Sequence, residues 1–212
     1  RWPDWFLSWR PDESPELGKK FDFVASSGVL HHLKQPEKGL EAILQTLKED
    51  GVLSISLYSK HARDHTLNPA SDYIKEKGYS ASTDDIRQFR RDVMMMSPDN
   101  PVFRCTSAGD FYFLSECNDL LFHVQEHRYT PRMIWEMADR HDLVPFHISM
   151  TSDRLKAFLE MFPGEDPLNP DLLEKFEEAH PKAFIEMYKI FLRRKTAPAT
   201  SPLDTLIKAG NL

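Results

Sequence analysis

Two adjacent histidines, His31 and His32, follow the small residues Ser26, Ser27 and Gly28. An imidazole titrates near neutral pH, so His31 is a candidate general base for an acceptor that must lose a proton. The alternative is that both histidines shape their loop through structural hydrogen bonds. A metal site is not expected, because adjacent histidines seldom converge on one ion and no third ligand is evident. The small residues before them would let a ligand approach the backbone closely.

A second set of polar residues lies further along the chain, in an otherwise apolar stretch. The set comprises Asp119, His123, Arg128 and Tyr129. These side chains could line a pocket for a second ligand, or they could form a hydrogen-bond network between helices. Cys105 and Cys117 are far apart and lack metal-like spacing, so both are predicted to be buried thiols of a cytosolic protein.

The histidine pair lies within a predicted strand–helix–strand unit. Phe21–Ser27 is a short apolar run that ends in small polar residues, which is typical of a buried strand. Apolar residues recur at helical spacing over residues 36–48, and Pro36 suits a first helical turn. Asp50-Gly51 predicts a turn, and residues 52–58 predict a second strand. The unit implies two parallel strands joined by a right-handed crossover.

The remaining sequence predicts mainly helices followed by two further strands. Thr130 can cap a helix that begins at Pro131, with Ile134, Met137 and Ala138 on its inner face. Pro145 places the next strand at a sheet edge or at a bulge. The predicted helices are residues 82–96, the helix from Pro131 to about residue 141, and residues 171–180; the strands are 143–150 and 187–193, and 118–124 is a short apolar stretch.

Composition excludes several classes of function. The chain has 212 residues and a formal net charge of -6, with no clustered basic face, which argues against nucleic-acid binding. No run approaches the roughly 20 apolar residues that span a bilayer, so no membrane association is expected. The N-terminus lacks a secretory signal pattern, and a cytoplasmic location follows as an expectation.

The strand–helix–strand unit resembles class I S-adenosylmethionine-dependent methyltransferases. The resemblance is carried by Phe21-Asp22-Phe23-Val24, by Gly28-Val29-Leu30-His31-His32-Leu33 and by Leu47-Lys48-Glu49-Asp50-Gly51-Val52-Leu53. It is close over residues 20–60, and it continues more weakly through Arg128-Tyr129-Thr130-Pro131. In that family these segments are the fourth strand, the loop and helix after it, and the fifth strand.

The resemblance implies S-adenosylmethionine as cofactor and assigns residues to its site. Ser26, Ser27, Gly28, Val29 and Leu30 would lie beside the methionine part of the cofactor, with His31 near the methyl donor. The acceptor would be a small molecule. Its binding residues would be His32, Tyr58, Asp119, His123, Arg128 and Tyr129.

The glycine-rich turn that normally holds this cofactor is absent from the sequence. No two of the eight glycines form a G-x-G pair, and the residues before Phe21 are too few for three strands. The expected fold is therefore α/β, the C-terminal half of a Rossmann-like methyltransferase sheet (strands four to seven) with a helical insertion. The first strand would leave an apolar edge through which the chain could self-associate.

The expected organisation is an irregular stretch (1–14), a partial methyltransferase domain (15–194) and a tail (195–212). Within the domain, residues 15–60 form the βαβ unit, 61–130 the helical insertion and 131–194 the last helices and strands. The first functional hypothesis is methyl transfer by an incomplete fragment. The alternative is a non-catalytic binding or interaction module that has lost the donor site. An α/β dehydrogenase ranks last, because no dinucleotide fingerprint is present.

Overall fold

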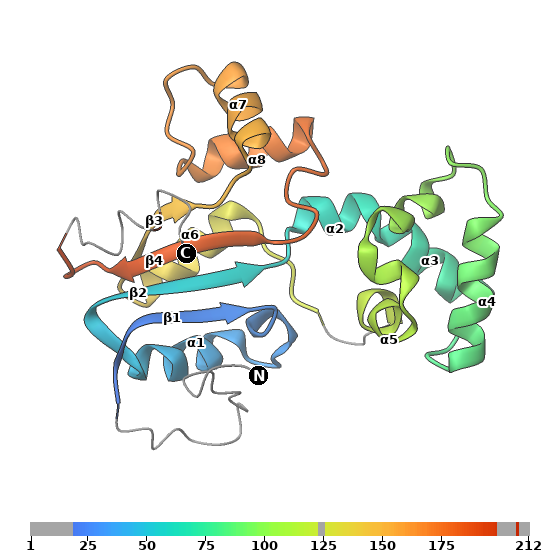
Figure 1. Cartoon of the computed structure of the whole chain (residues 1–212), viewed down its shortest axis with the longest axis horizontal. Helices are drawn as coiled ribbons and strands as arrows, with labels where there is room; N and C mark the ends of the chain where they lie inside the picture. The colour runs from blue at the N-terminus through green and yellow to red at the C-terminus, as the bar shows by residue number, and fades with distance from the viewer. Residues whose placement is uncertain (1–18, 123–125, 199–206, 208–212) are drawn as a thin grey trace.

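The computed structural model describes residues 19–122, 126–198 and 207, and these form a mixed sheet with helices packed against it (Figure 1). The strands are β1 (Phe21–Ser27), β2 (Leu47–Leu57), β3 (Leu143–Ile148) and β4 (Tyr188–Arg194), in the order β1-β2-β4-β3. β1 and β2 are parallel, whereas β4 lies antiparallel between β2 and β3. The predicted α/β class and the parallel pair are confirmed, and β1 forms one edge of the described sheet.

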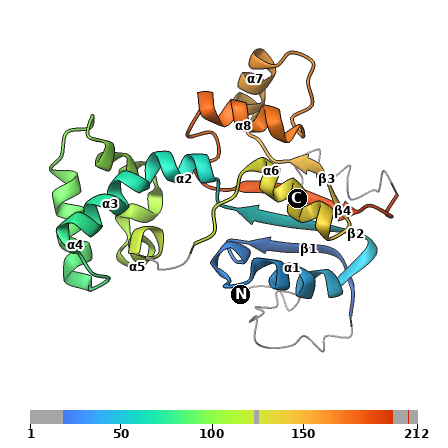
Figure 2. The same ribbon diagram turned by 180° about the vertical axis from the view of Figure 1, so that it is seen from behind.

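The main hydrophobic core lies on one face of the sheet, beneath α1 (Pro36–Gln45) and α6 (Pro131–Arg140) (Figure 2). Every second residue of β2 points into it, namely Leu53, Ile55 and Leu57. The predicted inner face of α6 is buried as expected, and the Thr130 hydroxyl caps this helix by accepting from the Met133 amide. The two helices are joined at the surface, where Arg140 and His141 both contact the Glu37 carboxylate.

The opposite face of the sheet carries a smaller apolar cluster. It contains Val52, Phe146 and Phe191, together with Ile207 near the end of the chain. Ile207 is only 2% exposed, so at this position the predicted tail packs on the sheet. Among the described residues, no helix is both long and apolar enough to cross a membrane.

The boundary between α1 and β2 differs from the sequence prediction. The helix ends at Gln45, where the Thr46 hydroxyl donates to the Ile43 carbonyl, and Leu47 opens the strand. The predicted turn at Asp50-Gly51 is wrong, because both residues lie inside β2. Pairing with β1 shifts between Phe21↔Leu47 and Phe23↔Val52, so the strand absorbs the turn-like residues as an irregularity.

Gly51 is required by the close approach of β1 and β2. A Cβ built there would lie 3.0 Å from the Phe21 carbonyl oxygen and 3.1 Å from that of Asp22. Backbone atoms of a paired strand cannot move aside as a side chain can. We expect Gly51→Ala to lower the free energy of unfolding by about 1–3 kcal/mol, measured by urea denaturation. An alanine at Gly109, where a Cβ would meet nothing within 4 Å, is the control and should change stability far less.

Residues 60–122 form a separate helical lobe at the end of β2 (Figure 1). It consists of α2 (Lys60–Thr66), α3 (Asn68–Lys77), α4 (Thr83–Met94), η2 (Pro101–Ser107), η3 (Gly109–Tyr112), α5 (Leu114–Cys117) and η4 (Asn118–Phe122). Its core shares no residue with the core beneath the sheet. Two backbone segments connect the lobe to the sheet, and they pair with each other at Ser59 and Tyr129.

The lobe buries both cysteines, as predicted. Cys105 and Cys117 are free thiols in its core. Burial raises the pKa of Cys105 to about 12 and that of Cys117 to about 11, so neither is a thiolate at neutral pH.

The C-terminal elements follow the prediction with one omission. β3 lies at the sheet edge and its register shifts between Pro145 and His147, so both predictions from Pro145 are confirmed. α8 (Pro170–Ala179) lies near its predicted position, but α7 (Ser152–Met161) was missed. Its signals are a Thr151 cap and apolar residues at helical spacing, which the neighbouring prolines obscured.

Candidate functional site

The carboxyl end of β1 leads into a loop that begins at Gly28. Gly28 follows the strand with φ +72°, a left-handed conformation, and a Cβ built there would meet nothing within 4 Å. Ser27 and Val29 on either side of it are exposed, whereas Ser26 and Leu30 are buried. Leu30 therefore anchors the loop in the core while Gly28 leaves the backbone approachable. We call residues 26–32 the donor loop, after the cofactor role that the resemblance implies for them.

Gly39 in α1 allows the residues after Gly28 to pack closely on that helix. A Cβ at Gly39 would lie 2.4 Å from Leu33 Cδ1 and 3.0 Å from Leu30 Cδ2. The histidine pair is thus held against α1 by leucines on both sides of it in sequence.

His31 is fully buried and stacked on Tyr58. The two ring centroids are 3.9 Å apart with an interplanar angle of 32°, and neither nitrogen of His31 has a hydrogen-bond partner among the residues that the structure describes. Burial, aided by the charges of His32, Arg63 and His127, lowers the pKa of His31 to about 3. A group with so low a pKa is neutral at pH 7 and is a weak proton acceptor, so this environment does not favour the general-base role.

Arg63 covers the second face of Tyr58. The guanidinium carbon lies 3.4 Å from the Tyr58 ring centroid, and one phenol face cannot hold both this group and the His31 ring at these distances. Tyr58 therefore lies between them. Arg63 is 4% exposed, and its Nη2 lies 3.4 Å from Oε2 of Glu126. Within the described ranges its Nε has no hydrogen-bond partner.

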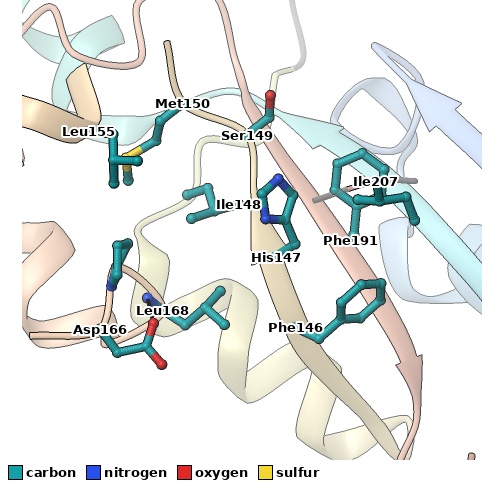
Figure 3. A pocket seen from close by; sticks show the side chains of 11 residues that line it. Phe146, His147, Ile148, Ser149, Met150, Leu155, Asp166, Leu168, Phe191 and Ile207 are labelled. Carbon is teal, nitrogen blue, oxygen red and sulfur yellow. Dashed lines mark hydrogen bonds between the residues drawn. The ribbon is translucent and has the colours of Figure 1, made fainter. Parts of the chain in front are cut away.

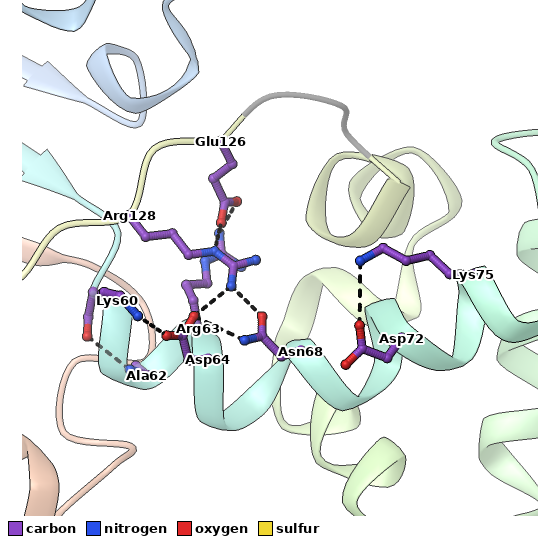
Figure 4. Close-up of polar contacts among 10 residues, drawn as sticks. Lys60, Ala62, Arg63, Asp64, Asn68, Asp72, Lys75, Glu126 and Arg128 are labelled. Carbon is purple, nitrogen blue, oxygen red and sulfur yellow. Dashed lines mark hydrogen bonds and ion pairs between the residues drawn. The ribbon is translucent and has the colours of Figure 1, made fainter.

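Arg128, expected at the substrate, joins segments of the protein to one another (Figure 4). Its Nε donates to Glu126 at 2.9 Å, and its Nη1 donates to Asp64 at 2.9 Å and to Asn68 at 2.5 Å. Asp64 is also paired with Lys60. These contacts match the hydrogen-bond network that was the alternative for this residue, and they tie the segment after the lobe to α2 and α3.

The other residues predicted to bind the acceptor lie in different parts of the structure. His32 lies edge-on to His31, with ring centroids 4.4 Å apart, and 5.8 Å from the Tyr58 ring. Tyr129 is buried in the main core, where burial raises its pKa to about 12, and its amide donates to the Tyr58 carbonyl at 2.9 Å. Asp119 is exposed in η4 of the lobe. His123 lies outside the described residues.

Comparison with known proteins bears directly on these residues. A family model described as a methyltransferase domain matches residues 4–98, which include β1, the donor loop, Tyr58 and Arg63. The resemblance to class I methyltransferases is confirmed. The match begins at residue 4, within the stretch expected to be irregular, and residues 1–18 are outside the described part of the chain.

Two solved structures share the methyltransferase fold of this chain. They are the structure of PKMT2 from Rickettsia typhi, with a TM-score of 0.59 and 13% identity, and the structure of the same protein in complex with AdoHcy, with a TM-score of 0.58 and 14% identity. Each match covers 93% of this chain and 40% of that chain. This chain therefore spans well under half of the length of those proteins.

Sequence reasoning missed three residues that lie near the histidine pair. They are Arg63, Glu126 and His127, whose amide donates to the His31 carbonyl at 2.8 Å. Ser59 gave a usable signal for the first of them, because its side chain caps α2 and so places Arg63 one turn into a helix that starts beside Tyr58. Glu126 and His127 adjoin the selected Arg128, but only the fold brings them to the loop.

A buried carboxyl group fixes the start of α2. Glu177 of α8 is 1% exposed, and it accepts hydrogen bonds from the Ser59 hydroxyl, at 2.6 Å, and from the Tyr188 hydroxyl. The same Ser59 oxygen accepts from the Ala62 amide. Burial raises the pKa of Glu177. The element that carries Arg63 is therefore held from α8 and β4.

A hollow of about 520 Å³ lies at the other edge of the sheet (Figure 3). It is bounded by the end of β3, by Leu155 of α7, by residues 166–168 and by Ile207. β3 and β1 are at opposite edges of the described sheet, so this hollow is distinct from the donor loop. Within the described ranges, no three His, Cys, Asp or Glu side chains are grouped so that they could hold a metal ion.

Proposed function

We propose that this chain takes part in S-adenosylmethionine-dependent methyl transfer, with the donor loop at the methionine part of the cofactor. The observation that carries the proposal is the left-handed Gly28, with open space beside it, at the carboxyl end of β1. In open α/β sheets, ligands bind at this end of the strands. The family match over the same residues supports the assignment of Ser26, Ser27, Gly28, Val29 and Leu30 to the cofactor.

The residues of the donor loop suit this cofactor because they allow it close to the backbone and shield it from water. When bound, the cofactor supplies an electrophilic methyl group. Gly28 allows it close to the backbone, and the apolar Val29 and Leu30 exclude water from that side. We assign His31 a positioning role in which its buried ring supports the donor loop from within, through its contacts with Tyr58 and His32. His32 and Tyr58, which surround His31, lie on the proposed acceptor side.

The chain is proposed to supply one half of the methyltransferase sheet, strands four to seven, and to act on a small-molecule acceptor in the cytoplasm. The low coverage of the PKMT2 structures is consistent with a part of a longer domain. The β1 edge is the proposed surface for self-association. The second candidate function is a non-catalytic binding module, and the absence of any G-x-G pair from this sequence favours it.

AdoHcy binding by the purified chain tests the proposal. Calorimetric titration should give saturable binding to the unaltered chain and none to Gly28→Trp, because the indole would fill the space beside the loop. Gly28→Asn is the backbone control, since asparagine tolerates a left-handed conformation and adds little bulk. Gly78→Trp is the matched bulk control, because Gly78 has φ +70° and open space but caps α3 in the lobe.

The outcome of the titrations decides between the proposed donor site and the non-catalytic module. Binding that is lost in Gly28→Trp and retained in both controls would support the donor site. Equal binding by Gly28→Trp and the unaltered chain would place AdoHcy elsewhere and contradict the assignment. No binding by a chain shown to be folded would favour the non-catalytic module.

A further inference from the structure

We propose that Arg63 is a positioning residue that couples the helical lobe to the donor loop, holding His31 in place through the ring of Tyr58. The proposal rests on the proposed function, because it concerns the same donor loop. Its basis is the stack of three groups from three elements. His31 belongs to the donor loop, Tyr58 follows β2, and Arg63 belongs to α2 of the lobe.

The lobe and the sheet meet close to the donor loop. Their hydrophobic cores share no residue, and the connecting segments pair through the backbone at Ser59 and Tyr129. Two contacts among the described residues link this junction to the donor loop, namely the Tyr58 stack and the hydrogen bond from the His127 amide to the His31 carbonyl. Of these two, the stack contacts the His31 ring itself.

Arg63 is fixed by its own helix, which a positioning residue requires. The N-terminus of α2 is capped by Ser59, and Ser59 is held by the buried Glu177. One residue after Arg63, Asp64 is bound by Arg128. The guanidinium is thus placed by contacts that do not involve the donor loop. It packs on the face of Tyr58 opposite to His31.

A planar guanidinium suits this position better than an ammonium group. It stacks flat on an aromatic ring and tolerates burial, because it is more weakly hydrated than the lysine head group. Burial lowers the pKa of Arg63, and Glu126 is the carboxylate facing it. Lysine would preserve the charge, but it would not place a planar, delocalised group over the Tyr58 ring.

The charged and titratable groups around His31 come from four places. His32 is on the same loop, Tyr58 is at the end of β2, Arg63 is on α2, and His127 is on the segment after the lobe. Replacing Arg63 removes a nearby positive charge and uncovers one face of Tyr58. Both changes should raise the pKa of His31, because a proton on its ring is no longer repelled and the ring is free to leave the stack.

The test compares Arg63→Met and Arg63→Lys with Arg90→Met. Arg90 is a matched control within the lobe, because its guanidinium also lies over an aromatic ring, 5.8 Å from the Phe111 centroid, away from the donor loop. The first measurement is the titration of His31 in the ligand-free chain, followed by NMR of the imidazole carbons. The second is AdoHcy affinity by calorimetry, with near-ultraviolet circular dichroism showing that each variant is folded.

We expect Arg63→Met to raise the pKa of His31 and to weaken AdoHcy binding about tenfold, whereas Arg90→Met changes neither. Arg63→Lys should leave the His31 pKa close to that of the unaltered chain, because lysine keeps the positive charge. It should nevertheless bind AdoHcy more weakly than the unaltered chain does. The proposal is overturned if the His31 titration is the same in Arg63→Met and the unaltered chain, or if lysine restores the affinity fully.

The NMR measurement keeps the two proposals separate. A chain that binds no AdoHcy contradicts the proposed function, yet the ligand-free titration still decides whether Arg63 acts on His31. A chain that binds AdoHcy normally in all variants overturns the role of Arg63 and leaves the donor loop assignment standing.

Discussion

The stability of this chain is expected to fall as the pH drops below about 6.5, and His31→Phe should remove much of that fall. His31 has an ordinary pKa of 6.5 when unfolded and a pKa of about 3 when folded. The folded state thus binds fewer protons, so the stability it contributes is present above pH 6.5 and is lost progressively as the pH falls towards 3. The full span corresponds to roughly 5 kcal/mol.

Phenylalanine is the appropriate replacement because it keeps a flat ring on Tyr58 and removes two buried nitrogens that have no partner. Urea denaturation at a series of pH values measures the difference between the variant and the unaltered chain. Taking this difference cancels the carboxylates, such as Asp64, whose lowered pKa also destabilises the fold in acid. His180→Phe is the matched control, since His180 stacks on Phe176 but is exposed.

A pH profile of His31→Phe that parallels the unaltered chain would show that His31 titrates normally. It would then be exposed or partnered in solution, and the stack with Tyr58 would not persist.

Phe89→Ala is expected to unfold the helical lobe at lower denaturant than the sheet. Phe89 is fully buried in the lobe core, where four aromatic rings have centroids within 6.4 Å of its own. Replacing a buried phenylalanine by alanine costs about 3–5 kcal/mol. Because the lobe has its own core, that loss should appear as a first unfolding step confined to the lobe.

Hydrogen exchange resolved along the chain measures this directly. In Phe89→Ala, amides of α3 and α4 should lose protection while those of β2 and β4 keep it. Phe158→Ala is the converse variant, since Phe158 is equally buried but belongs to the core beneath the sheet. Uniform loss of protection over both units in Phe89→Ala would show that the two cores unfold together.

The sequence predicted the fold best where periodicity and caps agreed. β1 and its parallel partner, α6 with its Thr130 cap, and the edge strand at Pro145 all follow from local signals. The errors arose where a local signal was overridden by pairing. Asp50-Gly51 has the composition of a turn, but β1 holds it in a strand.

The site was predictable only in part, for a physical reason. The donor loop is contiguous in sequence, so its small residues and histidines could be selected from the chain alone. Arg63 and His127 are 32 and 96 positions from His31, and their contact with its surroundings depends on how the lobe returns to β2. Burial decides that His31 is neutral, and a residue type alone does not reveal burial.

The pairing of Ser59 with Tyr129 has a consequence for how this chain can vary. Two residues 70 positions apart occupy adjacent backbone positions, so everything between them is an excursion that leaves and re-enters at one place. The entropic cost of closing such an excursion rises only slowly with its length. The segment between these two residues can therefore change in length at little entropic cost, provided that the contacts its helices make with Tyr58 and Arg128 are replaced.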